Sequence, residues 1–223
     1  MNHPRRFVRL GAVAVIAAVL AASATGVAGA APREVGGRPD RAARPEIPKD
    51  PRWATPPGYD EQPGDAGSTG DGRNDLQFGA FDDGDIVVAI ESLSVGHAGE
   101  WDDRYYSSVY SQCVWSAVKS SLGCVVREAP LKYRTYDRAY GLWVPSVSDA
   151  ARIACRNYCV AQIGEPYNIS SSKTDQSKWY CSKLVWASYK YKASKDLDAN
   201  GGYWVAPVDL YNDNDTSVFV ASN

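Results

Sequence analysis

The histidines and cysteines are the residues of this chain that could carry nucleophilic chemistry, and they are few. The 223 residues contain two histidines and five cysteines. His3 lies in a stretch that is typical of an export signal, so His97 is the one imidazole left to the remainder of the chain. A cysteine thiolate attacks carbonyl carbons and usually needs a base beside it. Any cysteine–histidine pair must therefore use His97, unless that histidine is only a structural residue.

Cys181 is the cysteine best placed to act as the nucleophile. An odd number of cysteines in an exported protein leaves one unpaired, and Cys181 begins a predicted helix. The free N–H groups and the dipole at a helix start favour a thiolate. We therefore predict that Cys181 is the only free thiol, the alternative being a small buried hydrophobic residue.

The other four cysteines are expected to form disulfides, because export implies an oxidising compartment. Cys113 and Cys124 flank a short hairpin or loop and are the favoured pair. Cys155 and Cys159 lie four residues apart on one predicted helix, where a disulfide would fit poorly. Pairing between the helix and the hairpin stays open.

The elements that must position these residues follow from hydrophobic periodicity. A Gly84-Asp85 turn leads into a buried strand over 86–90, and Gly96-His97-Ala98-Gly99 enters a second strand. The cysteine helix is predicted over 180–192. We expect further strands over 109–115, 123–127 and 140–144, a helix over 148–163 that Ser148 caps, and short strands or extended chain over 205–220. Strands followed by helices predict an α+β fold.

The composition fits one folded domain, predicted over 76–223. Hydrophobic residues make up 44% of the chain and charged residues 22%, so a core is expected. The net charge of −2 gives no basic excess for nucleic acid. We expect a monomer that needs neither a metal nor another cofactor.

Two segments are predicted to precede this domain. Residues 1–30 combine three arginines, an apolar run and small residues that fit a cleavage site at Ala28-Gly29-Ala30, or earlier at Ala22-Ser23-Ala24. The run is too short for a comfortable membrane span, although an uncleaved anchor is the alternative. Residues 31–75 hold eight of the 13 prolines and are predicted to be a disordered linker. A secreted or cell-wall-associated protein, without stable membrane insertion, is therefore expected.

Three stretches of the sequence together resemble one enzyme family. Gly84-Asp85-Ile86, Gly96-His97-Ala98-Gly99 and Tyr180-Cys181-Ser182-Lys183-Leu184-Val185-Trp186 are similar to the permuted NlpC-type, papain-like cysteine hydrolases of the YiiX/YycO kind. In that permuted group the histidine strand precedes the cysteine helix, as it does here. The resemblance covers roughly 81–210 and implies an antiparallel sheet packed with helices.

The resemblance also implies further site residues. Gly164-Glu165-Pro166-Tyr167 is similar to the segment that leads into the cysteine in NlpC-type enzymes, which makes Tyr167 a candidate oxyanion donor, or else ordinary packing. Relatives often carry a glutamate on the strand after the histidine strand, where this sequence has Ser116. We prefer Ser116 as the residue that orients His97, with Glu128 as the alternative; a serine would stabilise an imidazolium less well.

The function implied by the resemblance is an exported thiol hydrolase that cleaves an amide bond, in a cell-wall (peptidoglycan) peptide stem. Two alternatives stay open: a cysteine-dependent acyltransferase that modifies lipids, and a degenerate domain that binds wall peptide or protein without cleaving it. The segment Asp196-Leu197-Asp198-Ala199-Asn200-Gly201 matches the opening of a calcium loop, but its twelfth position is Pro207, where a glutamate is required. A polar turn is the preferred interpretation.

Overall fold

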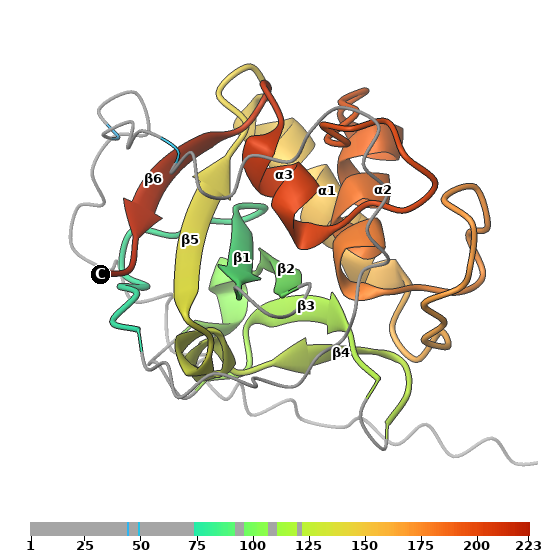
Figure 1. Ribbon diagram of the computed structural model, residues 1–223, viewed down its shortest axis with the longest axis horizontal. Helices are drawn as coiled ribbons and strands as arrows, with labels where there is room; N and C mark the ends of the chain where they lie inside the picture. The colour runs from blue at the N-terminus through green and yellow to red at the C-terminus, as the bar shows by residue number, and fades with distance from the viewer. Residues whose placement is uncertain (1–43, 45–48, 50–73, 92–95, 107–110, 120–121) are drawn as a thin grey trace, which may run out of the picture. The chain divides into compact units, whose positions relative to one another are not determined.

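One antiparallel sheet of six strands forms the framework of the protein. The structure is a computed structural model that describes residues 44, 49, 74–91, 96–106, 111–119 and 122–223. Figure 1 shows the strands in the spatial order β4-β3-β2-β1-β5-β6. Their bounds are β1 Ile86–Ile90, β2 His97–Trp101, β3 Val114–Ala117, β4 Val125–Glu128, β5 Arg138–Trp143 and β6 Ser217–Ala221. Together with the helices, this sheet confirms the predicted α+β class.

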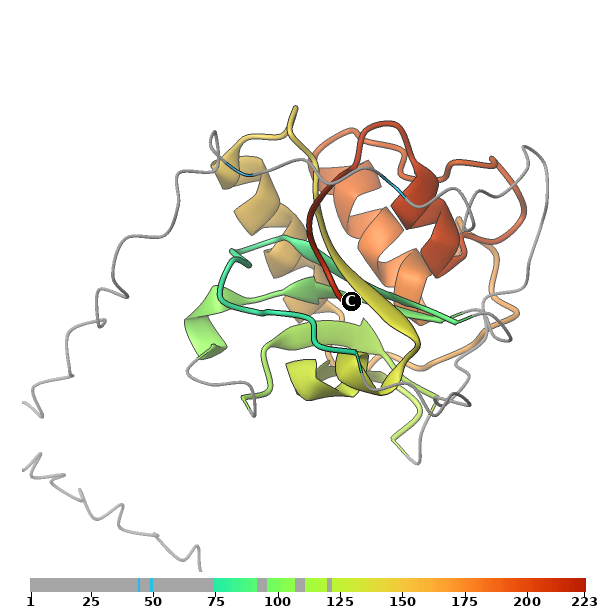
Figure 2. The same ribbon diagram turned by 60° about the vertical axis from the view of Figure 1, so that its left-hand side comes forward.

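Three α-helices lie together beside this sheet, as both Figure 1 and Figure 2 show. They are α1 Asp149–Ala161, α2 Cys181–Lys192 and α3 Pro207–Asn212, and two 3-10 helices add η3 Asp103–Tyr105 and η4 Pro130–Thr135. The predicted cap of α1 is confirmed, because the Ser148 side chain accepts a hydrogen bond from the Ala151 N–H. The helix α2, over Cys181–Lys192, is the cysteine helix predicted over 180–192.

The helix α3 corrects the prediction of strands or extended chain throughout 205–220. Pro207 occupies the first turn of α3, where its missing N–H costs nothing. The Asp209 side chain accepts a hydrogen bond at 2.7 Å from the Ala206 N–H and so secures the helix start. These two local signals override the weak β pattern, and the strand β6 begins only at Ser217.

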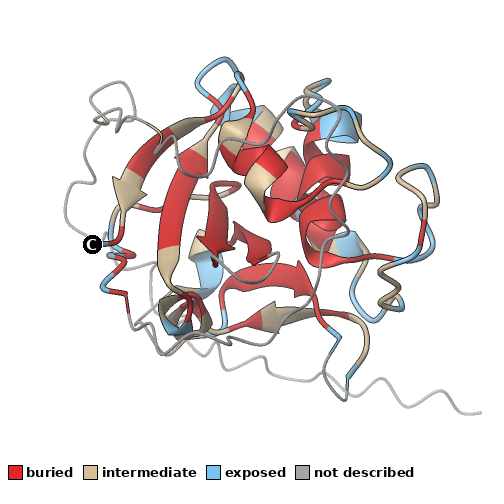
Figure 3. Ribbon diagram, in the orientation of Figure 1, coloured by how far each residue is buried: buried red, intermediate tan, exposed pale blue. Residues whose placement is uncertain are grey.

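The strand β1 is buried on both faces and separates two apolar clusters. Its alternate residues Ile86, Val88 and Ile90 belong to the larger cluster, which the helices cover. Val87 and Ala89 point to the opposite cluster, which includes Trp101 and Tyr133. Figure 3 shows this burial running through the central strands and along α2. A strand covered on both faces reads as a continuous apolar run, which is why β1 was predictable.

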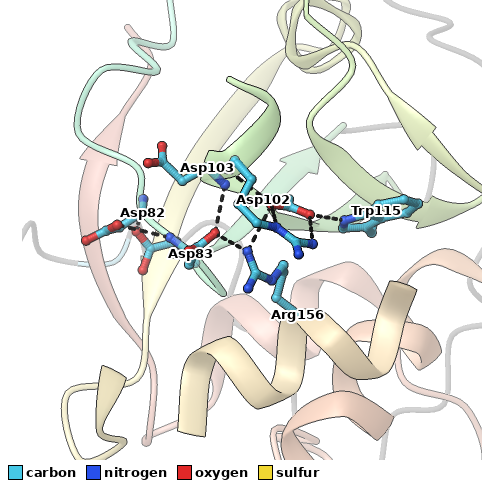
Figure 4. A network of polar contacts seen from close by, with 8 residues as sticks. Asp82, Asp83, Asp102, Asp103, Trp115 and Arg156 are labelled. Atoms are coloured by element: carbon cyan, nitrogen blue, oxygen red, sulfur yellow. Dashed lines mark hydrogen bonds and ion pairs between the residues drawn. The ribbon is translucent and has the colours of Figure 1, made fainter. Parts of the chain in front are cut away.

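A network of ion pairs and hydrogen bonds joins α1 to the sheet. Figure 4 shows Arg156 of α1 reaching Asp83 and Asp102, at 2.7 and 3.0 Å respectively. Asp102 also accepts a hydrogen bond from the Trp115 indole N–H at 2.9 Å, and Asp83 accepts one from the Asp103 N–H. Since Arg156 is buried, these two carboxylates balance the charge of a guanidinium that would otherwise be costly to bury.

The predicted leader, residues 1–30, and most of the predicted linker, 31–75, lie outside the described residues. Among the described linker residues, Arg44 and Lys49 make specific contacts with the folded domain. Arg44 forms a buried ion pair with Asp85 at 2.9 Å, and its guanidinium lies 4.1 Å from the centroid of the Phe219 ring. The Lys49 ammonium donates to Thr216 at 3.0 Å. No helix within the described part of the chain is long and apolar enough to cross a membrane.

Candidate active site

The sulfur of Cys181 is placed at the beginning of α2, as predicted. Tyr180 has extended backbone and is the N-cap residue, and its side chain makes no capping hydrogen bond to the helix. Cys181 is the first helical residue and is fully buried. The first N–H groups of a helix have no partner within the helix, and the helix dipole places partial positive charge there. The sulfur therefore lies beside free N–H donors and the partial positive charge of the helix start.

His97 is the first residue of β2, and glycines on both sides fit it closely into the sheet. Gly96 has a φ of +77°, and a Cβ there would meet the Ala89 carbonyl oxygen at 2.1 Å. A Cβ at position 99 would lie 2.5 Å from the Tyr133 hydroxyl oxygen. The Gly-His-x-Gly spacing therefore has a physical reason, since a side chain at either glycine would displace the surroundings of the ring.

Glu128, at the end of β4, is the main partner of the His97 ring. Its Oε2 lies 2.6 Å from His97 Nε2, and both side chains are buried. Burial opposes charge on the ring, but the negative charge of Glu128 and the hydrogen-bonding influence of Cys181 and Glu128 raise the pKa of His97 to about 9. Burial likewise opposes charge on Glu128, yet His97 and Lys132 bring its pKa down to about 2. Near neutral pH the pair is therefore an imidazolium and a carboxylate.

The geometry corrects the preference for Ser116 over Glu128. The Ser116 hydroxyl oxygen lies 3.3 Å from His97 Nε2, farther than the carboxylate, and donates its proton to the Ala98 carbonyl at 2.8 Å. The serine oxygen can still accept from the ring N–H, but it is uncharged and more distant, whereas the Glu128 carboxylate is charged and lies at 2.6 Å. The sequence alternative, Glu128, holds the position from which His97 is oriented.

The second ring nitrogen, Nδ1, is the one left for Cys181 once Glu128 has taken Nε2. Nδ1 is buried and makes no hydrogen bond within the described residues. The Cys181 thiol is near enough to the ring to raise the pKa of His97. Nucleophile–base contacts are often looser than ideal before a substrate binds. The His97 imidazole thus has Glu128 as its partner at Nε2 and the Cys181 thiol as its second neighbour.

Tyr167 lies on the chain segment beside the residues that lead into α2. Its backbone forms an isolated parallel bridge with Trp179, two residues before the cysteine. Its N–H donates to the Gly123 carbonyl at 2.7 Å, and its partly buried side chain packs against the larger apolar cluster. The structure places Tyr167 near the start of α2 through its backbone, and its role toward an oxyanion stays a prediction.

The 3-10 helix η4 supplies site residues that the sequence reasoning missed. The Lys132 ammonium lies 2.5 Å from Glu128 Oε1, the carboxylate oxygen that does not face the ring. The Tyr133 ring stacks on the imidazole with a centroid distance of 5.3 Å, and the Tyr136 ring at 6.2 Å. One sequence signal was present: Glu128 and Lys132 are four residues apart around Pro130, a residue that favours the first turn of a helix.

The structure corrects both cysteine predictions, because all five cysteines are free. Cys113 lies beside Glu128, whose carbonyl accepts its N–H, whereas Cys124 lies beside Val118 at the opposite end of the β3–β4 hairpin. The intervening strand length of roughly 16 Å far exceeds the separation that a disulfide spans. Cys155 and Cys159 are both buried on α1 and also unbridged. Cys181 is therefore one free thiol among five.

The calcium-like segment is a polar turn in the structure. The Asp198 carboxylate accepts hydrogen bonds from Lys173 and from the Gly201 N–H, and Asp196 accepts them from Lys190 and the Trp186 indole. These acidic side chains are thus engaged by cations and N–H donors. Among the described residues, no group of three or more His, Cys, Asp or Glu could hold a metal ion.

Comparisons with known proteins give weak and partial similarities. No family profile matches the chain. A 70-residue stretch is 36% identical to the uncharacterized protein YycO of Bacillus subtilis (strain 168), and it covers 29% of this chain and 28% of YycO. The crystal structure of the metalloprotein YiiX from Escherichia coli O157:H7 has a TM-score of 0.46 and 16% identity, covering 61% of this chain and 95% of that protein. The stretch matched to YycO is therefore under a third of the length of either protein.

Proposed function

We propose that the chain is an exported thiol hydrolase that cleaves an amide bond, with Cys181 as nucleophile, His97 as base and acid, and Glu128 as the orienting carboxylate. The observation that carries this proposal is the 2.6 Å contact between His97 Nε2 and Glu128 Oε2, in a ring whose pKa also responds to the Cys181 thiol. A nucleophile, a base and a third group that orients the base form the arrangement that activates weak nucleophiles.

In the first half of the reaction the ring holds the proton of the thiol at Nδ1, and the Cys181 sulfur attacks the amide carbon. A carbon–sulfur bond forms, and the carbonyl π electrons move onto oxygen. The uncapped N–H groups at the start of α2 are the donors for this oxyanion, and Tyr167 is a second candidate donor. His97 then protonates the amide nitrogen, the carbon–nitrogen bond breaks, and a thioester remains.

In the second half the imidazole removes a proton from water as the water oxygen attacks the thioester carbon. The carbon–sulfur bond breaks, the acid product leaves, and the proton returns to the Cys181–His97 pair. Glu128 acts as a carboxylate, because the cations His97 and Lys132 lower its pKa. Its task is to fix the ring and to stabilise the imidazolium, as the carboxylate does in other catalytic triads.

The substrate class rests on the sequence resemblance, which implies a peptide stem of the cell wall. Cys181 and His97 have no exposed surface in this conformation. Burial shields a thioester from unproductive water, and it requires the chain around the sulfur to admit the substrate. Acyl transfer to an acceptor other than water would use the same thioester, so the products distinguish the two reactions.

Incubation of the chain with purified wall peptides, followed by mass spectrometry of the products, tests this proposal. The expected result is cleavage by the wild type and no cleavage by Cys181→Ala. His97→Ala should lower turnover by about 10²–10⁴-fold, the usual contribution of general acid–base catalysis. Binding of the peptides without turnover by the wild type would instead favour the degenerate binder. Full activity of His97→Ala would exclude the Cys–His mechanism.

A further inference from the structure

Lys132 shares the carboxylate of Glu128 with the candidate base. Its ammonium lies 2.5 Å from Oε1, while Oε2 lies 2.6 Å from His97 Nε2. Each oxygen of one buried carboxylate therefore faces one cationic group. The Lys132 side chain is 33% exposed, whereas that of Glu128 is 8% exposed and that of His97 is fully buried. Lys132 is thus the member of this chain of contacts that meets the solvent.

The local sequence explains how the ammonium reaches this position. The strand β4 ends at Glu128, and Pro130 starts η4 two residues later. The tight turn brings position 132 back over position 128, as residues four apart come together on a helical surface. The next residue, Tyr133, places its ring against the imidazole. The helix η4 therefore positions both Lys132, which contacts the Glu128 carboxylate, and Tyr133, whose ring stacks on the His97 imidazole.

Several other groups surround the imidazole, and Lys132 is distinct among them in its charge. They come from three elements, β3, β4 and α2, and from η4 with the residue that follows it. The groups are Ser116 of β3, Glu128 of β4, Cys181 of α2, and Lys132, Tyr133 and Tyr136 of the η4 region. Within this set Lys132 brings positive charge, and it acts against protonation of the ring. Glu128 and Cys181 favour protonation of the ring.

We infer that Lys132 is a positioning residue of this site, whose ammonium holds the Glu128 carboxylate turned toward His97. The same ammonium also acts against protonation of the ring. A base that kept its proton too tightly would release it slowly to the leaving nitrogen. The inference rests on the proposed function only for this catalytic consequence. The electrostatic relation between Lys132 and His97 can be measured without a substrate.

The experiment is an NMR titration of the imidazole signals in the full chain. His3 is the only other histidine, and its signal is the one that remains in His97→Asn. In Lys132→Met the midpoint of His97 should rise above that measured for the wild type by about 0.5–1 pH unit, because a nearby cation has been removed. Lys132→Arg should keep the wild-type midpoint.

The matched control is Lys190→Met, which removes a lysine that is also ion-paired, with Asp196, toward the far end of α2. It should leave the midpoint of His97 unchanged. A midpoint in Lys132→Met that equals the wild-type value, or lies below it, would overturn the inference. Failure of the proposed function looks different: wall peptides would stay intact with the wild type, while the midpoint of His97 would still depend on Lys132.

Discussion

The Nε2 atom of His97 lies 2.6 Å from Oε2 of Glu128, across a face of the sheet from one strand to another that is not its neighbour. The two residues belong to β2 and β4, and Ser116 of the intervening β3 lies beside their contact. Both partners are buried, so their charges are screened little by water. This contact fixes the orientation of the ring and leaves Nδ1 as its other nitrogen.

Replacing Glu128 with Gln should disable the site while Ser116→Ala should change it little. The amide of Gln cannot stabilise an imidazolium, so turnover should fall by about 10²–10⁴-fold. The pKa of His97 should fall well below about 9, because burial remains while the carboxylate is lost. Losing the Ser116 hydroxyl removes one neutral contact, an effect of about fivefold. Steady-state kinetics and an NMR titration measure both variants, and equal losses would refute the assignment of Glu128.

The pH dependence of turnover follows from the same contact. The imidazolium that protonates the leaving nitrogen is present below a pKa of about 9 and is lost as the pH rises through that value. We therefore expect kcat/KM to fall on the alkaline side of about pH 9 in the wild type, and at a lower pH in Glu128→Gln. A profile that is flat to pH 10.5 in the wild type would contradict this assignment of the acid.

The cysteines should differ sharply in their reaction with iodoacetamide near neutral pH. Burial raises the pKa of Cys113 to about 12 and those of Cys155 and Cys159 further, so these thiols are protonated and inert. Cys181 lies at a helix start beside the imidazolium and should react first among the buried cysteines. Peptide mapping of a Cys124→Ser variant, which removes the partly exposed thiol, measures this order. Faster labelling at Cys113 than at Cys181 would argue against an activated sulfur.

The sequence predicted the parts of the site that depend on local pattern. Cys181 was expected from the odd cysteine count and the helix start, His97 as the one imidazole outside the predicted leader, and their pairing from the family resemblance. The structure places Cys181 at the start of α2 and His97 at the start of β2. Glu128 was only the second choice, because its approach to His97 depends on the twist and curvature of the sheet across two strand pairs, which no strand pattern encodes. Lys132 was missed for a related reason, since it acts through Glu128. Hydrophobic periodicity predicts where an element lies in the chain, and it does not predict which side chains meet across a sheet.

The predicted disulfide between Cys113 and Cys124 was wrong because of the strand register. Cys113 and Cys124 are close in sequence, but each lies just before a strand of one antiparallel hairpin. In that arrangement two such residues lie at opposite ends of the hairpin. A short loop between cysteines therefore indicates an easy disulfide only when the residues face each other. The register of β3 and β4, which the sequence pattern did not predict, keeps the two cysteines apart.

Arg44 should stabilise the folded domain although it lies in the predicted linker. Arg44→Met removes a buried partner of Asp85, and breaking a buried ion pair of this kind costs about 3–5 kcal/mol. Denaturant unfolding of the full chain should show a lower midpoint with an unchanged slope. Lys49→Met is the control, since its ammonium contacts are only partly buried and its effect should be smaller. Equal midpoints for Arg44→Met and the wild type would mean that the segment does not hold Asp85.

Glu100 should make the protein less stable as the pH rises. Its carboxyl is buried between the sheet and the helices, where Oε2 accepts hydrogen bonds from Ser188 at 2.6 Å and from the Cys159 thiol at 3.1 Å. Within the described residues, Oε1 has no hydrogen-bond partner. Burial raises the pKa of Glu100 from 4.5 to about 8, so the folded protein binds a proton that the unfolded chain has already lost. The free energy of unfolding must then decrease between pH 4.5 and about 8.

Glu100→Gln tests this relation, because glutamine keeps the shape and cannot ionise. The wild type should lose on the order of a few kcal/mol between pH 5 and pH 8 through Glu100, a loss that the variant should not show. His97 contributes a slope of the same sign between its ordinary value of 6.5 and about 9, so the variant keeps that smaller part. Urea unfolding at pH 5, 6.5 and 8 separates the two contributions. If the variant followed the wild-type curve at all three values, Glu100 would be ionised in the folded protein and its burial would be compensated by contacts other than those of Cys159 and Ser188.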